Sequence, residues 1–165
     1  LFKKVELSQK AIGSRLGPDD AYLIIRGLRT LDIRLEKHQQ NALKIAKFFS
    51  KQRKVKEVFY PFKKNTNQYK MWKKYYSGAS GLMGIKVLSK NKNSVIKFLN
   101  KLKLFSYGYS WGGFESLALY QDKLALGNRS YTKLNNNEHI IRLHIGLEDP
   151  NDLIADIKQA IKSIR

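Results

Sequence analysis

Apolar residues in the first third of the chain recur at the three- and four-residue spacing of helices. This spacing predicts a helix end over residues 1–16, a short helix from Pro18 to a bend at Gly27, and a long helix over about 30–52. Pro18 suits the first turn of a helix, and Asp19 and Asp20 stabilise the positive end of its dipole. The chain therefore opens with helices.

The rest of the chain alternates between strand and helix patterns. Period-two alternation predicts strands over 55–60, 81–88, 105–109 and 140–145, and helical spacing predicts helices over 68–73, 94–102 and 150–164. Asp149 and Pro150 supply an N-cap and a first residue for the last helix. This order predicts a two-layer α+β fold, a small sheet covered on one face by helices. The open face of such a sheet needs a cover, and we expect a larger domain that this chain lacks.

Charge and composition narrow the class of protein. The chain has 32 basic and 13 acidic residues, a net charge of +19. The lysines are scattered over every segment together with many asparagines, which indicates a compositional bias more than a basic footprint, so nucleic-acid binding is kept as a distant alternative. The absence of cysteine excludes disulfides and thiolate chemistry and suits a cytoplasmic protein. No apolar run approaches the roughly 20 residues of a membrane helix. The start at Leu1, without methionine, suggests a piece of a longer protein.

Two segments carry the candidate chemistry, 104–117 and 141–149. In the first, a predicted strand runs into a turn at Gly112 and Gly113 that presents Ser110 and Trp111. In the second, Arg142 lies in the middle of an apolar strand, where a guanidinium needs an anionic partner. Together they predict half of a pocket for the carboxylate of an amino acid.

Each of these residues has a structural alternative. Arg142 could form an ion pair with Glu115 or Asp149, and spacing alone favours that alternative. Trp111 could pack in the core beyond a tight turn. The three histidines do not form a metal set, because His139 and His144 fall on opposite faces of one strand and His38 has no second ligand at helical spacing. We therefore expect no metal site and no catalytic residue from these histidines.

Several motifs in order resemble the Cys/Met-metabolism pyridoxal-phosphate (PLP) enzymes, and within them the cystathionine β-lyases. The motifs are Gly17-Pro18-Asp19-Asp20-Ala21-Tyr22, Arg26-Gly27-Leu28-Arg29-Thr30-Leu31, Arg34-Leu35 with His38, Tyr60-Pro61, 77–82, 104–117 and 141–157. Tyr109-Ser110-Trp111-Gly112-Gly113 and Arg142-Leu143-His144 resemble the β-lyase forms; the related γ-synthases and γ-lyases more often have serine in place of His144.

The resemblance implies the C-terminal small domain of a fold-type I PLP-dependent enzyme, with a mostly antiparallel sheet. It assigns residues 1–30 to the end of the large domain and its linking helices and 31–165 to the substrate-side domain, with the N-terminal cofactor domain absent. Arg142 matches the residue that binds the substrate α-carboxylate, which reverses the preference from spacing, and Ser110, Trp111 and Tyr109 match the substrate-contacting turn. The implied reaction is β-elimination of L-cystathionine in methionine synthesis, with a cystathionine γ-synthase or γ-lyase as the alternative, in a homotetramer.

The resemblance also implies what this chain lacks. The lysine that bonds PLP and the residues that bind its phosphate lie upstream of both substrate motifs in this family. Ser130-Tyr131-Thr132-Lys133 is similar to the family's cofactor signature, but it lies between the two substrate motifs and precedes a polar Asn135-Asn136-Asn137 loop. We therefore expect no catalytic lysine in this chain, and no activity from the chain alone.

Overall fold

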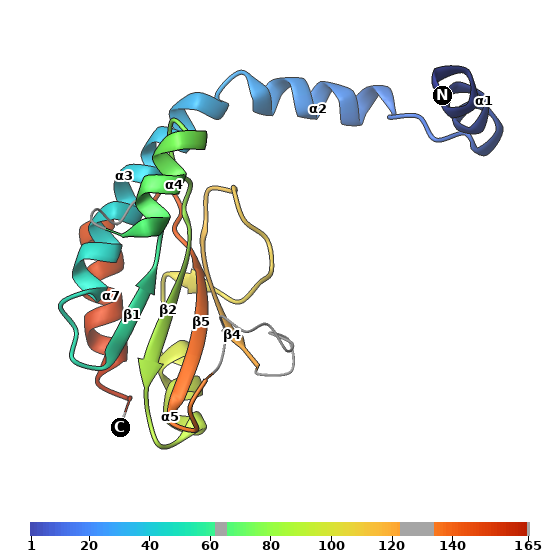
Figure 1. The fold of residues 1–165 in the computed structure, drawn as a ribbon. Coiled ribbons are helices and arrows are strands. Elements are labelled where there is room, and N and C mark those ends of the chain that lie inside the picture. The colour runs from blue at the N-terminus through green and yellow to red at the C-terminus, as the bar shows by residue number, and fades with distance from the viewer. Residues whose placement is uncertain (62–65, 123–133, 165) are drawn as a thin grey trace. The chain divides into compact units, whose positions relative to one another are not determined.

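The structure, a computed structural model, describes residues 1–61, 66–122 and 134–164 (Figure 1). It divides into two compact units, Leu1–Ile33 and Arg34–Arg165. The segment Ser130–Lys133, whose sequence is similar to the cofactor signature, lies outside the described ranges. No helix among the described residues has both the length and the apolar character needed to span a membrane.

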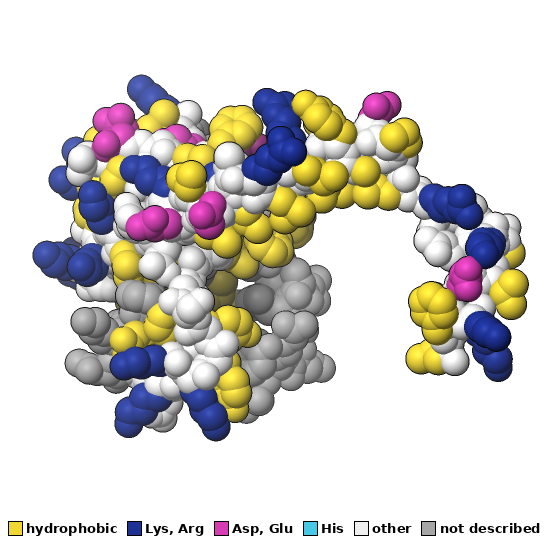
Figure 2. Space-filling model, turned by 90° about the horizontal axis from the view of Figure 1, so that it is seen from above, with side chains coloured by type: hydrophobic (Ala, Val, Ile, Leu, Met, Phe, Trp, Pro, Cys, Tyr) yellow, Lys and Arg dark blue, Asp and Glu magenta, His cyan; other side chains and the backbone are white. Residues whose placement is uncertain are grey.

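The first unit consists of helices with exposed apolar side chains. α1 (Phe2–Ile12) ends where Gly13 adopts a φ of 66°, so the prediction of helix to residue 16 is wrong; the left-handed glycine stops it earlier. α2 (Pro18–Leu28) starts with proline, as predicted, and runs through Gly27, so the predicted break falls after Leu28 instead. Neither helix has a buried residue, and hydrophobic side chains gather on the visible surface of α2 (Figure 2).

The second unit is built around one mixed sheet. Its strands within the described residues are β1 (Val55–Phe59), β2 (Leu82–Leu88), β3 (Phe105–Ser106), β4 (Ser116–Gln121) and β5 (Glu138–His144). They lie in the order β1-β2-β5-β4-β3, and among them only β3 and β4 pair in parallel. The predicted α+β architecture with a mostly antiparallel sheet is confirmed.

Helices pack against one face of this sheet and form the core (Figure 1). They are α3 (Leu31–Phe49), α5 (Lys92–Asn100) and α7 (Pro150–Ile161), and α4 (Asn67–Tyr75) buries Trp72. The helical spacing predicted for α3 holds, because Ala42, Ile45 and Phe49 are fully buried. On the strands every second residue faces these helices, as the burial alternation of β2 shows. The other face of the sheet therefore carries Arg142 and His144.

The strands differ from the prediction in two places. β4 was not predicted, because its Leu117, Ala118 and Leu119 are all buried and show no alternation of polar and apolar residues. The strand predicted over 105–109 ends at Ser106, since Tyr107 and Tyr109 are exposed and leave the ladder. Residues 107–115 instead connect the two parallel strands β3 and β4 across the sheet face opposite the helices, where Gly108 lies beside Leu117.

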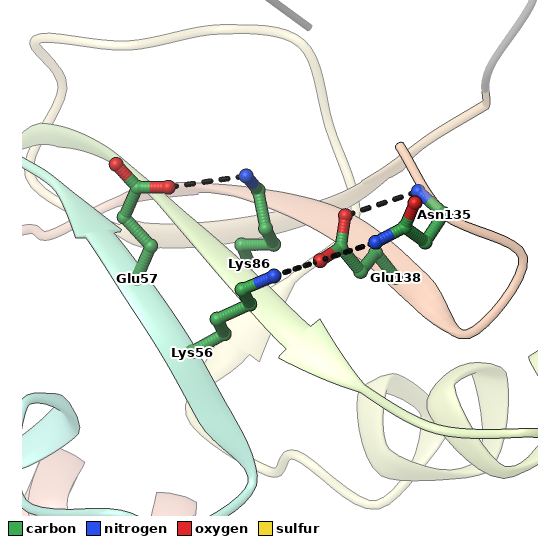
Figure 3. A network of polar contacts seen from close by, with 5 residues as sticks. All are labelled: Lys56, Glu57, Lys86, Asn135 and Glu138. Carbon is green, nitrogen blue, oxygen red and sulfur yellow. Dashed lines mark hydrogen bonds and ion pairs between the residues drawn. The ribbon is translucent and has the colours of Figure 1, made fainter. Parts of the chain in front are cut away.

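Polar pairs cross the outer face of β1, β2 and β5 (Figure 3). The pairing of β1 with β2 shifts register between Val55 and Glu57, and the bulge places both Lys56 and Glu57 on the outer face. Lys56 donates to the buried carboxylate of Glu138, which also accepts the Asn135 N–H at 3.0 Å, and Lys86 pairs with Glu57 at 3.1 Å. These pairs join three strands on the face that carries Arg142.

Candidate functional site

Arg142 is bound to the backbone of the predicted turn. Its Nη1 donates to the Tyr109 carbonyl at 2.7 Å, and its Nη2 lies 3.5 Å from the Ser110 carbonyl. The side chain is half-buried on β5, with Gly84 of β2 and Leu119 of β4 as its cross-strand neighbours. Within the described residues Arg142 forms no ion pair, with Glu115, Asp149 or any other acidic residue, so the structural salt bridge considered from the sequence is not found.

The guanidinium is thus oriented by carbonyl oxygens and its charge is not neutralised by them. A guanidinium has five N–H donors, and two carbonyl contacts leave donors for an anion. Carbonyl oxygens fix the plane of the group, and a planar guanidinium can bind a carboxylate through two parallel hydrogen bonds. This arrangement can therefore act as a preoriented carboxylate clamp.

The structure brings three of the four predicted site residues together. Tyr109 and Ser110 contact Arg142 through their backbone carbonyls and not through their side chains. Trp111 follows them in the same turn with 62% of its surface exposed, so the alternative that it packs in the core of this unit is wrong. The side chain of Tyr109 is exposed as well, so both aromatic rings of the turn are accessible to a ligand.

The turn itself depends on glycine and on distant residues. Gly112 has a φ of 83°, a conformation that side-chain-bearing residues rarely adopt. Its carbonyl accepts from Arg34 Nη1 at 3.3 Å, and its N–H lies 3.1 Å from His144 Nε2. His144 Nε2 also lies 3.2 Å from the Gly113 carbonyl. Arg34 and His144 therefore hold the turn from α3 and β5.

Behind the turn, a buried hydrogen-bond frame joins β4, α3 and the segment after β5. Glu148 accepts from Ser116 N at 2.6 Å and from Ser116 Oγ at 2.8 Å. Asn41, which is buried on α3, donates to the Gly146 carbonyl at 3.0 Å and to the Glu148 carbonyl at 2.9 Å. The Leu147 N–H adds a bond of 2.8 Å to the Phe114 carbonyl. This frame fixes the C-terminal end of the 107–115 connection.

Sequence reasoning missed the supporting roles of Arg34, Asn41 and Glu148, and it assigned no contact with the turn to His144. The structure also leaves His144 Nδ1 and His38 Nε2 buried without a hydrogen-bond partner among the described residues. The signal that could have found Asn41 is its polarity on the buried side of an amphipathic helix. The others make contacts far along the chain, which no local pattern reports.

A separate hollow of about 920 Å³ lies beside α4. Its lining includes Leu35, Gln39, Trp72, Tyr76 and Leu82, and Arg142 is not part of it. Among the described residues no group of three or more histidines, cysteines or acidic residues could hold a metal ion. The guanidinium at the turn, in contrast, is an oriented cation that suits an anionic ligand.

The family model and similar curated proteins point to related PLP-dependent enzymes. The model of the Cys/Met metabolism PLP-dependent enzymes matches residues 1–162. The cystathionine beta-lyase of Escherichia coli is 38% identical over 148 residues, covering 88% of this chain and 38% of the relative. The cystathionine gamma-lyase of Dictyostelium discoideum is 37% identical over 164 residues, covering 98% and 42%. An L-alanine/L-glutamate racemase of Wolbachia pipientis is 37% identical over 162 residues, covering 98% and 40%.

A solved structure agrees with these relatives. A Campylobacter jejuni chain assigned as an O-acetylhomoserine (thiol)-lyase, in which a lysine carries a pyridoxyl phosphate group, superposes with a TM-score of 0.75 at 34% identity. It covers 92% of this chain, which in turn spans 34% of that one. The fold is therefore that of part of a fold-type I PLP-dependent enzyme, as the resemblance implied.

The chain spans about 40% of the length of the curated relatives it matches. These relatives are named for different reactions, so the comparisons identify the family of this chain but not the reaction. The family match covers nearly all of the chain, and these two relatives are more than one third identical to it over most of its length. This chain belongs to the Cys/Met metabolism family of PLP-dependent enzymes.

Proposed function

We propose that the chain is the C-terminal, substrate-side part of a PLP-dependent carbon–sulfur lyase. The proposed reaction is β-elimination of L-cystathionine with net uptake of one water, which gives homocysteine, pyruvate and ammonia, a step of methionine synthesis. The observation that carries the proposal is the Arg142 guanidinium held at the Tyr109 and Ser110 carbonyls without an acidic partner among the described residues. A preoriented cation of this kind suits the α-carboxylate of an amino-acid substrate.

In this proposal the chain binds and orients the substrate. Arg142 binds the α-carboxylate through paired charged hydrogen bonds, and the backbone at Ser110 positions the same end of the substrate. The exposed side chains of Tyr109 and Trp111 form the wall beside it and keep water from the bound amino acid. In this proposal these four residues bind and orient the substrate, and none of them transfers a proton.

The described residues fit the substrate side of a PLP site and not the cofactor itself. PLP needs an amine for its covalent bond and a cluster of donors for its phosphate, whereas the turn offers two carbonyls and one guanidinium. When bound, PLP acts as an electron sink for the bonds at the substrate Cα. We place its lysine and its phosphate-binding residues in the part of the relatives that this chain does not cover, and we expect the chain alone to be inactive.

Product analysis tests the reaction. The full-length PLP-loaded enzyme that contains this sequence is supplied with L-cystathionine, and the keto acid and thiol products are identified. Pyruvate with homocysteine supports the proposal. 2-Oxobutyrate with cysteine instead supports a γ-lyase, the alternative that the Dictyostelium relative favours. Formation of D-alanine from L-alanine without elimination would assign a racemase, as in the Wolbachia relative.

The assembly and compartment belong to the same proposal. We propose a homotetramer in the cytoplasm, on the resemblance to the family and on the absence of cysteine from the chain. Light scattering of the full-length enzyme tests the assembly; a mass of one subunit would contradict it.

A further inference from the structure

His144 meets two backbone groups of the turn that make opposite demands on one nitrogen. The Gly112 N–H can only donate, so His144 Nε2 must present a lone pair to it at 3.1 Å. The Gly113 carbonyl can only accept, so the same nitrogen must carry a proton to bond it at 3.2 Å. Only one of these bonds can be made in a given tautomer of a neutral ring.

The neighbouring His38 distinguishes the two tautomers. His38 Nδ1 lies 2.8 Å from the Ile145 carbonyl and must donate to it, which leaves His38 Nε2 as a lone pair in the neutral ring. The two rings are almost completely buried, with centroids 5.0 Å apart. His144 Nδ1 and His38 Nε2 form no hydrogen bond, with each other or with any other described residue. If His144 carries its proton on Nδ1, these two unbonded nitrogens are one donor and one acceptor, whose partial charges attract. If the proton is on Nε2, both unbonded buried nitrogens are lone pairs, whose partial charges repel.

Exposure of the turn supports the same tautomer. Gly113 is exposed, so its carbonyl can bond water when His144 does not donate to it, whereas Gly112 is half-buried. Among the turn groups that His144 Nε2 meets, the tautomer with the proton on Nδ1 thus leaves without a protein partner only the Gly113 carbonyl, which belongs to an exposed residue. We infer that His144 is a positioning residue: as a neutral imidazole protonated on Nδ1, beside His38, it holds the Gly112 N–H and fixes the turn whose carbonyls orient Arg142.

The electrostatic surroundings of His144 agree with a neutral ring. Burial lowers the pKa of His144; His38 and Arg142 lower it further, while the Gly113 carbonyl and Glu148 oppose this. A second proton would occupy Nε2 and remove the acceptor of the Gly112 N–H. The turn is therefore expected to loosen in acid. The consequence for substrate binding rests on the proposed function, but the hydrogen bond itself does not.

Nuclear magnetic resonance of the unsubstituted chain is a direct test. Long-range ¹H–¹⁵N correlations distinguish the Nδ1–H tautomer, the Nε2–H tautomer and the imidazolium. At neutral pH we expect His144 as the Nδ1–H tautomer. A ring that is mainly protonated on Nε2, or on both nitrogens, overturns the inference. This measurement needs neither a cofactor nor a variant.

Three variants test the positioning role. His144→Phe keeps a ring but removes the acceptor, and amide exchange at Gly112 should accelerate about tenfold, the equivalent of one lost hydrogen bond. His144→Gln retains a side-chain oxygen that can accept, and it should keep most of the protection. His139→Gln is the control, because His139 is also buried on β5 but contacts Tyr120 and Ser89 instead of the turn. Equal Gly112 exchange in His144→Phe and the control overturns the inference; if His144→Phe does not fold, the comparison of His144→Gln with the control decides.

In the full-length enzyme the same variants separate this inference from the proposed function. His144→Phe should raise KM for the amino-acid substrate more than it lowers kcat, and His144→Gln should restore most of the loss. If Gly112 behaves as expected but the enzyme has no lyase activity, the function is wrong and the positioning role stands. If the enzyme is an active lyase but Gly112 exchange is unchanged in His144→Phe, the proposed function stands and the positioning role of His144 is wrong.

Discussion

Ser116 Oγ links Glu148 to Gly146: it donates to Glu148 Oε2 at 2.8 Å and accepts the Gly146 N–H at 2.8 Å. Ser116 and Gly146 are both buried, so the Gly146 N–H cannot replace this hydroxyl with bulk water. The connection that carries the clamp therefore ends in a bond that bridges β4 and the segment after β5.

Replacing Ser116 with alanine should destabilise the chain. The buried Gly146 N–H would lose its acceptor and Glu148 one of its donors, at a cost of about 1–3 kcal/mol in the free energy of unfolding. Urea denaturation measures this cost. Ser50→Ala is the matched control, because Ser50 is exposed directly after α3 and its hydroxyl donates to the Ala46 carbonyl of that helix. Equal stability of the two variants would show that the bridge contributes nothing.

Gly146→Ala should also destabilise the chain, for a steric reason. A Cβ at Gly146 would overlap the Phe114 carbonyl oxygen and Glu148 Oε2 and would lie 2.6 Å from the Glu115 carbonyl carbon. Backbone atoms must move to admit it, which costs about 1–3 kcal/mol or more.

Gly113→Ala provides the contrast for this steric argument. It has open space around its Cβ position and no positive φ, so we expect it to be tolerated. Thermal unfolding of both variants measures the difference. A Gly146→Ala variant as stable as Gly113→Ala would contradict the close approach.

Arg142→Lys tests the clamp in the full-length enzyme. Lysine keeps the charge but cannot bond the Tyr109 carbonyl and a carboxylate through one planar fork. Loss of a charged hydrogen bond costs about 1.5–3 kcal/mol, so kcat/KM should fall between about tenfold and a factor on the order of 10². Arg53→Lys, an exposed arginine after α3, is the control for charge and expression. Unchanged kinetics in Arg142→Lys would remove this residue from substrate binding.

The outer-face network predicts a pH dependence of stability. The hydrogen bond from Lys56 lowers the pKa of Glu138 below its usual 4.5, and the Asn135 N–H adds to this. Because the folded pKa is lower than the unfolded one, the unfolded chain takes up the proton first as the pH falls. The contribution of Glu138 is therefore present above pH 4.5 and is lost as the pH falls through its folded pKa.

Urea midpoints measured on both sides of pH 4.5 test this dependence. Glu138→Gln should remove this part of the acid sensitivity, and Lys56→Gln should reduce it, since it removes the first cause of the lowered pKa. Acid sensitivity that is the same in both variants and the unsubstituted chain would mean that Glu138 does not contribute.

The parts of the fold that the sequence predicted are those with one buried face. α3, β2 and α7 each alternate between core and solvent, so their hydrophobic positions report their structure directly. β4 is buried on both faces and is rich in leucine and alanine, so its strand character comes from pairing with β5 and not from its own residues.

The site divides in the same way. Arg142 and the glycine turn could be found from the sequence, because an arginine in an apolar strand and a Gly-Gly pair are local signals. That Arg142 holds the carbonyls of Tyr109 and Ser110 could not, because backbone contacts depend on where the connection crosses the sheet. The pairing of His38 with His144 joins residues from α3 and β5, and no local spacing predicts it.

The bonds from α3 to the segment after β5 have a consequence for synthesis of the protein. His38 and Asn41 reach Ile145, Gly146 and Glu148, partners that the ribosome makes more than a hundred residues later. Closing so long a loop is entropically slow, and contacts of this kind form late in folding. A nascent chain can assemble its early helices, but it acquires an oriented guanidinium only after β5 and the segment that follows it have emerged.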